Sequence, residues 1–541
     1  MAHLLLFSVL PLCIGLGLFF GVMERLAPAR VAGWLGRRFW VGLGGLLLVL
    51  YGLCVGFSAC LTTMIDAVES TVGSTSALWL RGEPLYTTID AASRYSLLYG
   101  PLCYAPYALS MGLFGSSVAT LKVVMVALNL ALFATLWLVF RTMLRGAEVL
   151  IPLGFIAASL MMKGMSTFMI RGDATLVLAV ALGFLAVNLR RNWAAAGLFV
   201  VAGALALDIK FTGVIYLLVP FYLLWQRYGR WLAIGCACAI PAVALLPFGL
   251  HSVSARNYVE WIHEASKHPL ALKLFAMNFV AGVILLAPVV VLLLWVDRME
   301  PGQAQRFSGQ RWLLFTLLLV SVAGGIVTGS KLGAGRSHLN PGFIVAAYLA
   351  VVFWNRASSG GASTALRYGF AVYALVLVVP AISQTHDLWQ IGVERRGYAN
   401  AVNADLDEVL RTHPGETVEM GYSETPGADT TVDSLALFAP KLVLAGNPDL
   451  VDAGAMFDMG LSKLPIPEAT LDALRACKVQ VWLVPRGRAP FELTNAYAFD
   501  IPSRFPERHL FSAEFREAFA ETYRLQGSTT YYDLWACSRT R

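Results

Sequence analysis

Residues 274–296 read LFAMNFVAGVILLAPVVVLLLWV, a stretch of 23 residues without a charged side chain. A run of about 20 apolar residues is long enough to cross the hydrocarbon core of a bilayer as one helix. Helices of soluble domains show a polar face instead, at a period of 3.6 residues. The segment therefore predicts a membrane-spanning helix and places the chain in a membrane.

Eleven further apolar runs flank this segment, so the sequence predicts an α-helical polytopic membrane protein with about twelve spans. They lie at 4–22, 39–60, 117–140, 147–163, 174–190, 193–208, 211–226, 231–250, 312–328, 339–355 and 368–384. The whole chain of 541 residues is 57% hydrophobic and only 14% charged. Because soluble proteins carry about 25% charged residues, this composition excludes a soluble enzyme, a disordered chain and a disulfide-rich scaffold.

The run at 98–116 is apolar too, but prolines and glycines interrupt it, and we interpret it as an interfacial or re-entrant helix. The loops then fall into two sets. One set holds 15 Lys and Arg in 56 residues, whereas the loops 62–116, 163–173, 208–210, 251–273 and 329–338 hold 10 in 102. The positive-inside rule places the second set, and both termini, outside. The net charge of +7 is therefore a topology signal and no indication of nucleic-acid binding.

Two boundaries divide the chain. Residues 1–385 form the predicted transmembrane domain, and the run 4–22 lacks the preceding basic residues of a cleavable signal peptide. Residues 386–541 have a mixed composition, which predicts a small extracytoplasmic α/β domain. Helices are expected at 386–410 and 468–476, and strands at 417–420, 441–444, 479–484 and 529–535. In an oxidising compartment Cys477 and Cys537 can pair.

The first outer loop, 62–116, carries the sharpest chemical signal. Asp66 and Glu69 follow the second span at a spacing that puts both side chains on one face of a helix. A carboxylate at the membrane surface can act as a general base toward a hydroxyl. The alternative is an ordinary hydrated helix end. Four more side chains of this loop are candidates for a substrate pocket or, as interfacial anchors, for the bilayer surface: Arg81, Tyr86, Tyr95 and Tyr99.

This arrangement resembles the GT-C superfamily, the polytopic glycosyltransferases that use polyprenyl-phosphate sugars, including protein mannosyltransferase-like and aminoarabinose-transferase-like enzymes. The resemblance rests on an acid pair after an early span, Gly-x-x-x-Tyr at 82–86, Tyr-x-Pro at 99–101 and Leu-Phe-Gly at 113–115. It extends to Arg171-Gly-Asp173, to residues 208–213 and to 329–341. The acids are not adjacent, and Tyr-Gly-Pro replaces Tyr-Pro-Pro. The first departure leaves open which acid is the base.

The resemblance implies a sugar donor on a lipid phosphate and an extracytoplasmic glycan, lipid or protein acceptor, in a plasma (inner) membrane. Asp66, or else Glu69, would deprotonate the acceptor hydroxyl, and a single displacement would invert the anomeric carbon. Cations on the outer face would hold the donor phosphate and stabilise its developing charge. The candidates are Lys122, Arg171, Lys210, Lys331 and Arg336, with Asp173 and His338 in the substrate pocket.

Each of these cations can instead reach toward lipid headgroups, and Lys210 can pair with Asp208 across a tight turn. No cofactor is certain from the sequence, and a divalent metal is possible because His263, His268 and His338 share the outer side with the acids. Their spacing does not favour one. The amphipathic segment 256–265, with Tyr258, Trp261 and Ile262, is expected at the bilayer surface or as a simple connection.

Three other functions remain open from the sequence: a lipid or solute transporter or flippase, a ligase or polymerase of lipid-linked glycans, and a non-catalytic assembly factor. A transporter should carry charges deep in its spans and show repeated halves. The sequence instead gathers its acids in the outer loops. It has no phosphate-binding P-loop, no dinucleotide fingerprint and no nucleophile elbow. Because the predicted inner loops are too short for a nucleotide-sugar site, a lipid-linked donor is favoured.

Overall fold

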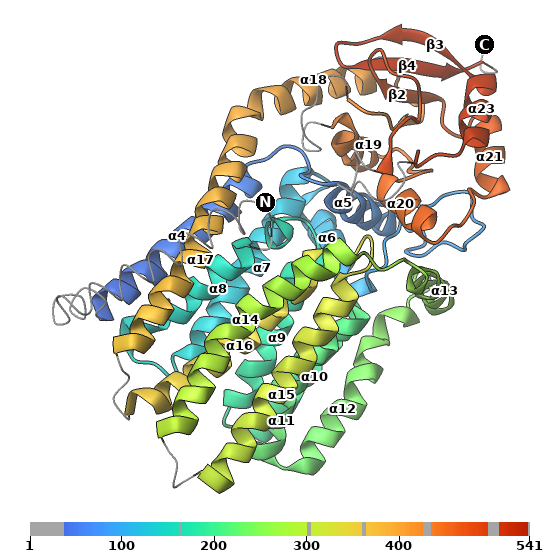
Figure 1. Ribbon diagram of the computed structural model, residues 1–541. Helices are drawn as coiled ribbons and strands as arrows, with labels where there is room; N and C mark the ends of the chain where they lie inside the picture. Colours follow the sequence, from blue (N-terminus) through green and yellow to red (C-terminus); the bar gives the residue numbers. More distant parts are fainter. Residues whose placement is uncertain are drawn as a thin grey trace.

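A bundle of long helices makes up most of the molecule, and a smaller part containing a sheet lies at one end of it (Figure 1). The computed structural model describes residues 37–162, 164–299, 304–359, 364–425, 434–495 and 508–538. The bundle helices are α4 (Arg37–Ala59), α7 (Val118–Phe140), α8 (Leu150–Met162), α9 (Gly172–Asn188), α10 (Asn192–Ile209), α11 (Leu218–Tyr228), α12 (Arg230–Ala244), α14 (Leu272–Met299), α15 (Ala304–Gly329), α16 (Asn340–Ser359) and α17 (Thr364–Trp389).

Seven helices of the described residues are long and apolar enough to cross a membrane: α4, α7, α10, α12, α14, α15 and α16. The expected spans at 147–163 and 174–190 form the shorter apolar helices α8 and α9. The predicted run 4–22 lies outside the described residues. The chain is thus a multi-pass membrane protein, while the count of twelve spans stays a prediction.

The helices α4 and α8 touch through two glycines, and this contact fixes one side of the bundle. A Cβ atom on Gly154 would stand 2.4 Å from the Cα atom of Gly44, and a Cβ atom on Gly44 would stand 2.3 Å from the carbonyl oxygen of Leu150. Small residues at such crossings let helix backbones approach closely in a membrane, where apolar side chains gain little by leaving lipid.

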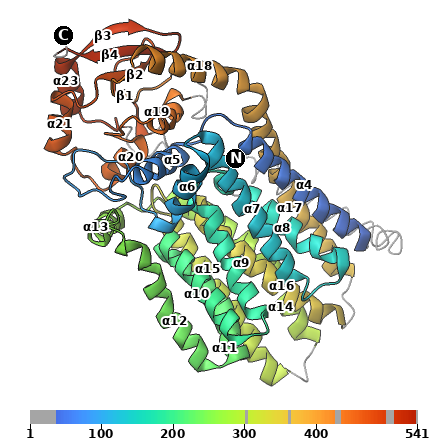
Figure 2. The same ribbon diagram turned by 180° about the vertical axis from the view of Figure 1, so that it is seen from behind.

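Three short helices occupy the end of the bundle that faces the sheet: α5 (Ala67–Leu80), α6 (Pro101–Phe114) and α13 (Ala255–Ser266). Opposite views place α5 and α6 between the bundle and the C-terminal part (Figures 1 and 2). Asp66 caps α5 by accepting a hydrogen bond from the Glu69 backbone N–H, and Pro101 begins α6. Both are residues that favour helix starts, and α6 covers the interfacial run that the sequence predicts.

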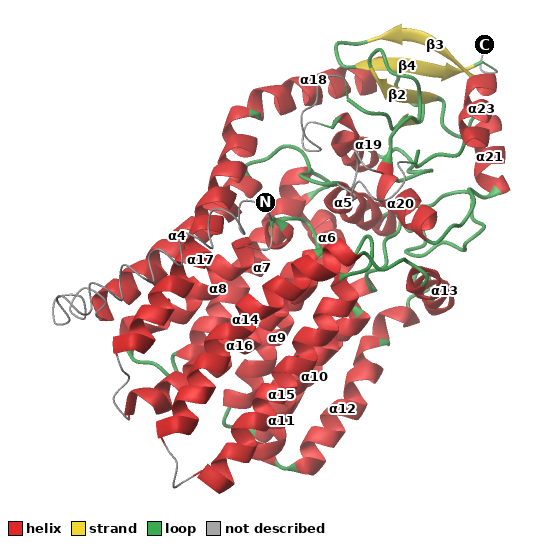
Figure 3. Cartoon of the chain, in the orientation of Figure 1, coloured by secondary structure: helices red, strands yellow, loops and turns green. Residues whose placement is uncertain are grey.

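The C-terminal part combines short helices with one four-stranded sheet, and Figure 3 shows its strands confined to this end of the molecule. The strand order is β1-β2-β4-β3, with β1 parallel to β2 and the other pairs antiparallel. Its elements are α18 (Arg396–Thr412), β1 (Val418–Met420), α19 (Ala439–Leu444), α20 (Ala453–Leu461), α21 (Glu468–Arg475), β2 (Val481–Pro485), α23 (Ala513–Thr522), β3 (Tyr523–Ser528) and β4 (Tyr532–Cys537). The predicted pairing of Cys477 with Cys537 is present.

One expectation for this end of the molecule is wrong, and the contacts of Trp261 favour one of two open alternatives. The predicted strand at 441–444 is the last four residues of helix α19, because a short apolar run can be buried in either conformation and Pro440 favours a helix start. Trp261 on α13 is 3% exposed and does not face a bilayer. Its indole N–H donates to the Thr87 carbonyl at 2.8 Å, and the guanidinium of Arg94 lies 3.4 Å above its ring.

Candidate active site

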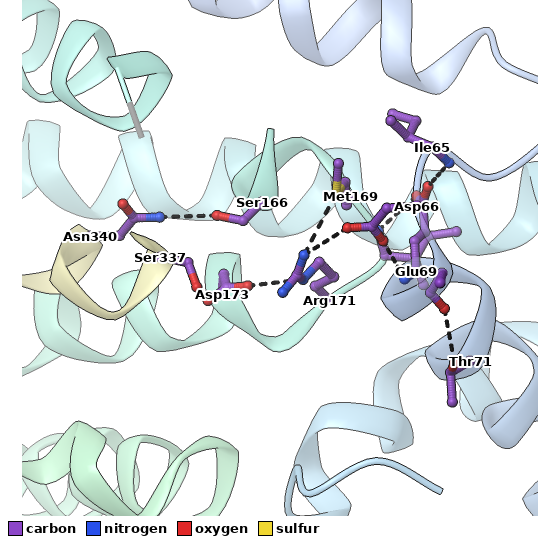
Figure 4. A network of polar contacts seen from close by, with 12 residues as sticks. Ile65, Asp66, Glu69, Thr71, Ser166, Met169, Arg171, Asp173, Ser337 and Asn340 are labelled. Atoms are coloured by element: carbon purple, nitrogen blue, oxygen red, sulfur yellow. Dashed lines mark hydrogen bonds and ion pairs between the residues drawn. The ribbon is translucent and has the colours of Figure 1, made fainter. Parts of the chain in front are cut away.

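Segments that the sequence assigns to one side of the membrane converge at the end of the bundle below the C-terminal part. Asp66 precedes α5, Arg171 precedes α9, Lys210 ends α10 and Ser337 precedes α16. Figure 4 shows the contacts of Arg171 with Asp66 and Asp173, with Ser337 close by. The topology prediction is confirmed to the extent that these loops share one end.

Asp66 caps helix α5 and also has a partly exposed carboxylate. Its Oδ1 accepts from the Glu69 backbone N–H at 2.7 Å, and its Oδ2 lies 2.8 Å from Nη1 of Arg171. The Asp66 side chain is 31% exposed. A carboxylate that is oriented from two directions and still open to the outside can receive a proton from a substrate.

Arg171, Asp173 and Lys210 form a buried ionic chain beside Asp66. Nε of Arg171 lies 3.2 Å from Asp173 Oδ2, and Nζ of Lys210 lies 2.8 Å from Asp173 Oδ1. Burial alone would raise the pKa of Asp173, but the attraction of Lys210 and Arg171 outweighs burial and holds that pKa at about 2. Burial opposes the charge on Lys210 as well, yet Asp173 raises the pKa of this lysine.

The chain of charges thus contains two cations, Arg171 and Lys210, and one fully buried anion, Asp173. Asp66 adds a second carboxylate, which is partly exposed. Lys210 also donates to the hydroxyl of Ser337 at 3.3 Å, and its ammonium lies 5.7 Å from the ring centre of Tyr99. Two cations held on a scaffold in this way form a suitable cradle for a phosphate. Tyr99 is therefore the tyrosine of the first outer loop that faces the cations.

The other aromatic candidates brace the loop instead. The hydroxyl of Tyr86 donates to the Tyr99 carbonyl at 2.6 Å, and that of Tyr95 donates to the Pro84 carbonyl at 2.7 Å. Arg81 points to the C-terminal part, where it donates to the carbonyl of Asn447 at 2.9 Å. These three side chains hold the loop in shape and do not contact the ionic chain through any hydrogen bond found among the described residues.

Glu69 and Lys122 form a second ion pair, which is fully enclosed. Lys122 Nζ lies 2.5 Å from Glu69 Oε1, and the two side chains are 1% and 0% exposed. Glu69 also accepts from the backbone N–H of Ile65 at 2.6 Å and of Ile170 at 2.9 Å. These two residues stand directly before Asp66 and Arg171, so Glu69 holds the base candidate and its cation in register.

The remaining candidates are Lys331, which lies apart from this cluster, Arg336, and His338, which lies near the cluster, since the charges of Lys210, Asp173 and Arg171 act on its ring. Lys331 donates to the carbonyl of Ser266 at 2.9 Å, on the α13 side. The side chain of Arg336 lies outside what the structure describes. His338 contacts Thr328, with Nδ1 3.2 Å from its hydroxyl.

The expected pairing of Lys210 with Asp208 is not formed. Asp208 Oδ2 instead accepts from the backbone N–H of Leu102 at 2.5 Å, which caps α6. A Cβ atom at position 100 would stand 2.0 Å from the Asp208 carbonyl oxygen. Gly100 is therefore required where the first outer loop meets α10. Among the described residues, no three His, Cys, Asp or Glu side chains come together as metal ligands.

One neighbour of Asp66 could not be found from the sequence. Asp452, at the start of α20, accepts from the Thr71 hydroxyl at 2.7 Å, across 381 residues of chain. It lines a small pocket together with Asp66. No sequence motif indicates this contact, because the C-terminal part reaches α5 only in the folded molecule.

Comparisons with known proteins yield structural counterparts. No family model matches the sequence, and no curated protein matches it. The crystal structure of ArnT from Cupriavidus metallidurans bound to undecaprenyl phosphate is similar with a TM-score of 0.52 and 12% identity, over 94% of this chain and 99% of that one. ArnT from the same organism in the apo state gives 0.53 and 13%, over 94% and 98%.

ArnT is an aminoarabinose transferase of the GT-C family. At 12% and 13% identity the similarity establishes the fold. It spans both the helical bundle and the C-terminal part, which is what the resemblance in the sequence predicts. The chain therefore has the fold of ArnT over nearly its whole length.

Proposed function

We propose that the protein is an integral-membrane glycosyltransferase that moves a sugar from a polyprenyl-phosphate donor to a hydroxyl on an extracytoplasmic acceptor. The observation that carries the proposal is the contact of a half-open carboxylate, Asp66, with the cation chain of Arg171 and Lys210 at one end of the bundle. A base and a phosphate cradle side by side are what this transfer needs. The fold supports the donor class, since one ArnT structure holds undecaprenyl phosphate.

The geometry divides the roles. Asp66 accepts the proton of the acceptor hydroxyl as its oxygen attacks the anomeric carbon. Arg171 and Lys210 hold the phosphate that leaves with the electron pair of the broken carbon–oxygen bond. A single displacement of this kind inverts the anomeric centre. Glu69 is enclosed by Lys122 and two backbone N–H groups, so we assign it and Lys122 to positioning the base.

Three further features favour a membrane enzyme whose site lies on the outer side of the membrane. The disulfide between Cys477 and Cys537 supports an oxidising compartment for the C-terminal part, and the positive-inside rule agrees. We propose a plasma-membrane location, with residues 386–541 as the extracytoplasmic domain. The described site charges gather at one end of the bundle and not at its middle, which favours this enzyme over a transporter.

The test is sugar transfer by the purified protein. A panel of radiolabelled polyprenyl-phosphate sugars serves as donors and a membrane extract as acceptor. We expect turnover by the wild type and a loss of about 10²- to 10⁴-fold in Asp66→Asn, the usual contribution of a general base. Transfer that survives in Asp66→Asn, in protein that melts like the wild type, would exclude Asp66 as the base. A wild type that is inactive with every donor would contradict the proposal.

A further inference from the structure

A small pocket lies between α5 and the C-terminal part, directly beside Asp66. Its volume is about 30 Å³, and Asp66, Ser70, Tyr422, Ser434 and Asp452 contribute polar groups to its walls. A water molecule needs roughly 10–15 Å³ of such space. The pocket therefore has room for one hydroxyl group or a hydroxymethyl group at the carboxylate that we propose as the base.

Asp452 is held rigidly on the wall that the C-terminal part supplies. Its Oδ1 accepts from the Thr71 hydroxyl at 2.7 Å and from the backbone N–H of Ala455 at 2.9 Å. Neither bond uses Oδ2. The side chain is 2% exposed. Asp452, oriented by α20 and by α5 together, thus lines a pocket that also contains Asp66.

The charges of this pocket differ from those of the phosphate cradle. Two carboxylates line it, and none of its described lining residues is Lys or Arg. Arg171 and Lys210 are not among its walls. A carboxylate accepts hydrogen bonds from hydroxyl groups. Arg171 pairs with Asp66 from outside this lining, so none of the described lining residues offers a cation to a phosphate, whereas the two carboxylates disfavour one.

From this geometry we infer that the pocket is the acceptor subsite, and that it takes a hydroxyl group of an uncharged glycan or glycolipid rather than a phosphate oxygen. Asp452 orients the acceptor toward Asp66. The inference rests on the proposed function. The acceptor O–H proton passes to Asp66, the oxygen bonds to the anomeric carbon, and the donor's carbon–oxygen bond breaks with its electrons on the departing polyprenyl phosphate.

The first experiment identifies the chemistry of the labelled product. After transfer to a membrane extract, unreacted donor is first removed by thin-layer chromatography, because the donor is itself anionic and acid-labile. The products are then separated by anion exchange into neutral and anionic fractions, and the anionic fraction is treated with mild acid to release sugars linked through phosphate. We expect the label in the neutral fraction. A label that mild acid releases from the anionic fraction would overturn the acceptor inference and leave the glycosyltransferase proposal standing. A wild type without any transfer would overturn both.

The second experiment tests Asp452 with Asp452→Asn, since asparagine retains the capping oxygen for α20 and removes the charge. We expect KM for the neutral acceptor fraction to rise at least about tenfold, the cost of one charged hydrogen bond. The affinity for polyprenyl phosphate, measured by its protection against thermal unfolding, should stay unchanged. A wild-type KM in Asp452→Asn would refute a role for Asp452 at the acceptor.

Two substitutions of alanine by leucine test whether the acceptor needs the space of the pocket. Ala436→Leu fills the pocket from the C-terminal side, whereas Ala445→Leu adds the same side chain at an exposed position after α19. The inference requires that Ala436→Leu lowers transfer to the acceptor and preserves donor protection, while Ala445→Leu changes neither. Equal transfer by both variants would show that no acceptor group enters the pocket.

Discussion

At the scale of single residues, Arg171 is the side chain whose shape matters most. Its Nη1 contacts Asp66 and its Nε contacts Asp173, so one planar group aligns the base with the cation chain. A lysine carries the same charge but only one nitrogen. We expect Arg171→Lys to lower kcat by about 10- to 100-fold because the base loses its alignment, while the melting temperature changes little. Steady-state kinetics test this expectation. A kcat of Arg171→Lys within twofold of the wild type would contradict the bridging role of Arg171.

The buried pair of Glu69 and Lys122 makes a second residue-scale prediction. Lys122→Met leaves an unpaired carboxylate in the interior, which costs about 3–5 kcal/mol. The double variant Glu69→Gln with Lys122→Met should recover part of this loss, because it leaves no unpaired charge. Thermal unfolding of the wild type, Glu69→Gln, Lys122→Met and the double variant measures the coupling. If Lys122→Met instead kept its stability and only weakened donor binding, Lys122 would be a phosphate ligand.

Between elements, the crossing of α4 and α8 offers adjacent glycines with opposite surroundings. A Cβ atom at Gly44 would meet the backbone of α8, while one at Gly45 would meet nothing within 4 Å. We expect Gly44→Ala to destabilise the protein by roughly 1–3 kcal/mol, as overpacking does. Gly45→Ala should be neutral or stabilising by up to about 1 kcal/mol through helix propensity. Unfolding in mixed micelles compares the two, and equal effects would refute the close crossing.

Elements also show what the sequence predicts well. The helix over the long apolar run at 274–296 follows from a local rule, and it is present. The run at 441–444 was assigned the wrong conformation because four apolar residues fit a helix or a strand equally. The enclosure of Lys122 by Glu69 and the approach of Asp452 to α5 depend on contacts between distant segments. Such contacts leave no local pattern.

For the whole molecule, buried carboxyl groups of the C-terminal part predict a pH dependence. Burial raises the pKa of Glu419 to about 8, that of Asp458 to about 7 and that of Asp452 to about 6. In the unfolded chain these groups titrate near 4. Their contribution to stability is complete below that value and is lost as the pH rises through 6 to 8.

The melting temperature should therefore fall between pH 5 and pH 9, by at least about 3 °C. Glu419 accepts from the backbone N–H of Leu450 and Val451, so Glu419→Gln keeps an acceptor oxygen and removes the titration. This variant should show a shallower slope. A protein that melts at the same temperature throughout this range would contradict the burial of these groups in neutral form.

The 381-residue separation of Thr71 and Asp452 also bears on biosynthesis. A ribosome releases the first outer loop long before it has made α20. During that interval the C-terminal part does not yet cover the loop. The Thr71 hydroxyl, which donates to Asp452 in the finished protein, then lacks this acceptor. Membrane chaperones and quality-control proteases can bind the loop during this interval. Nonsense mutations late in the gene would remove the C-terminal part and leave Asp66 without the pocket that encloses it.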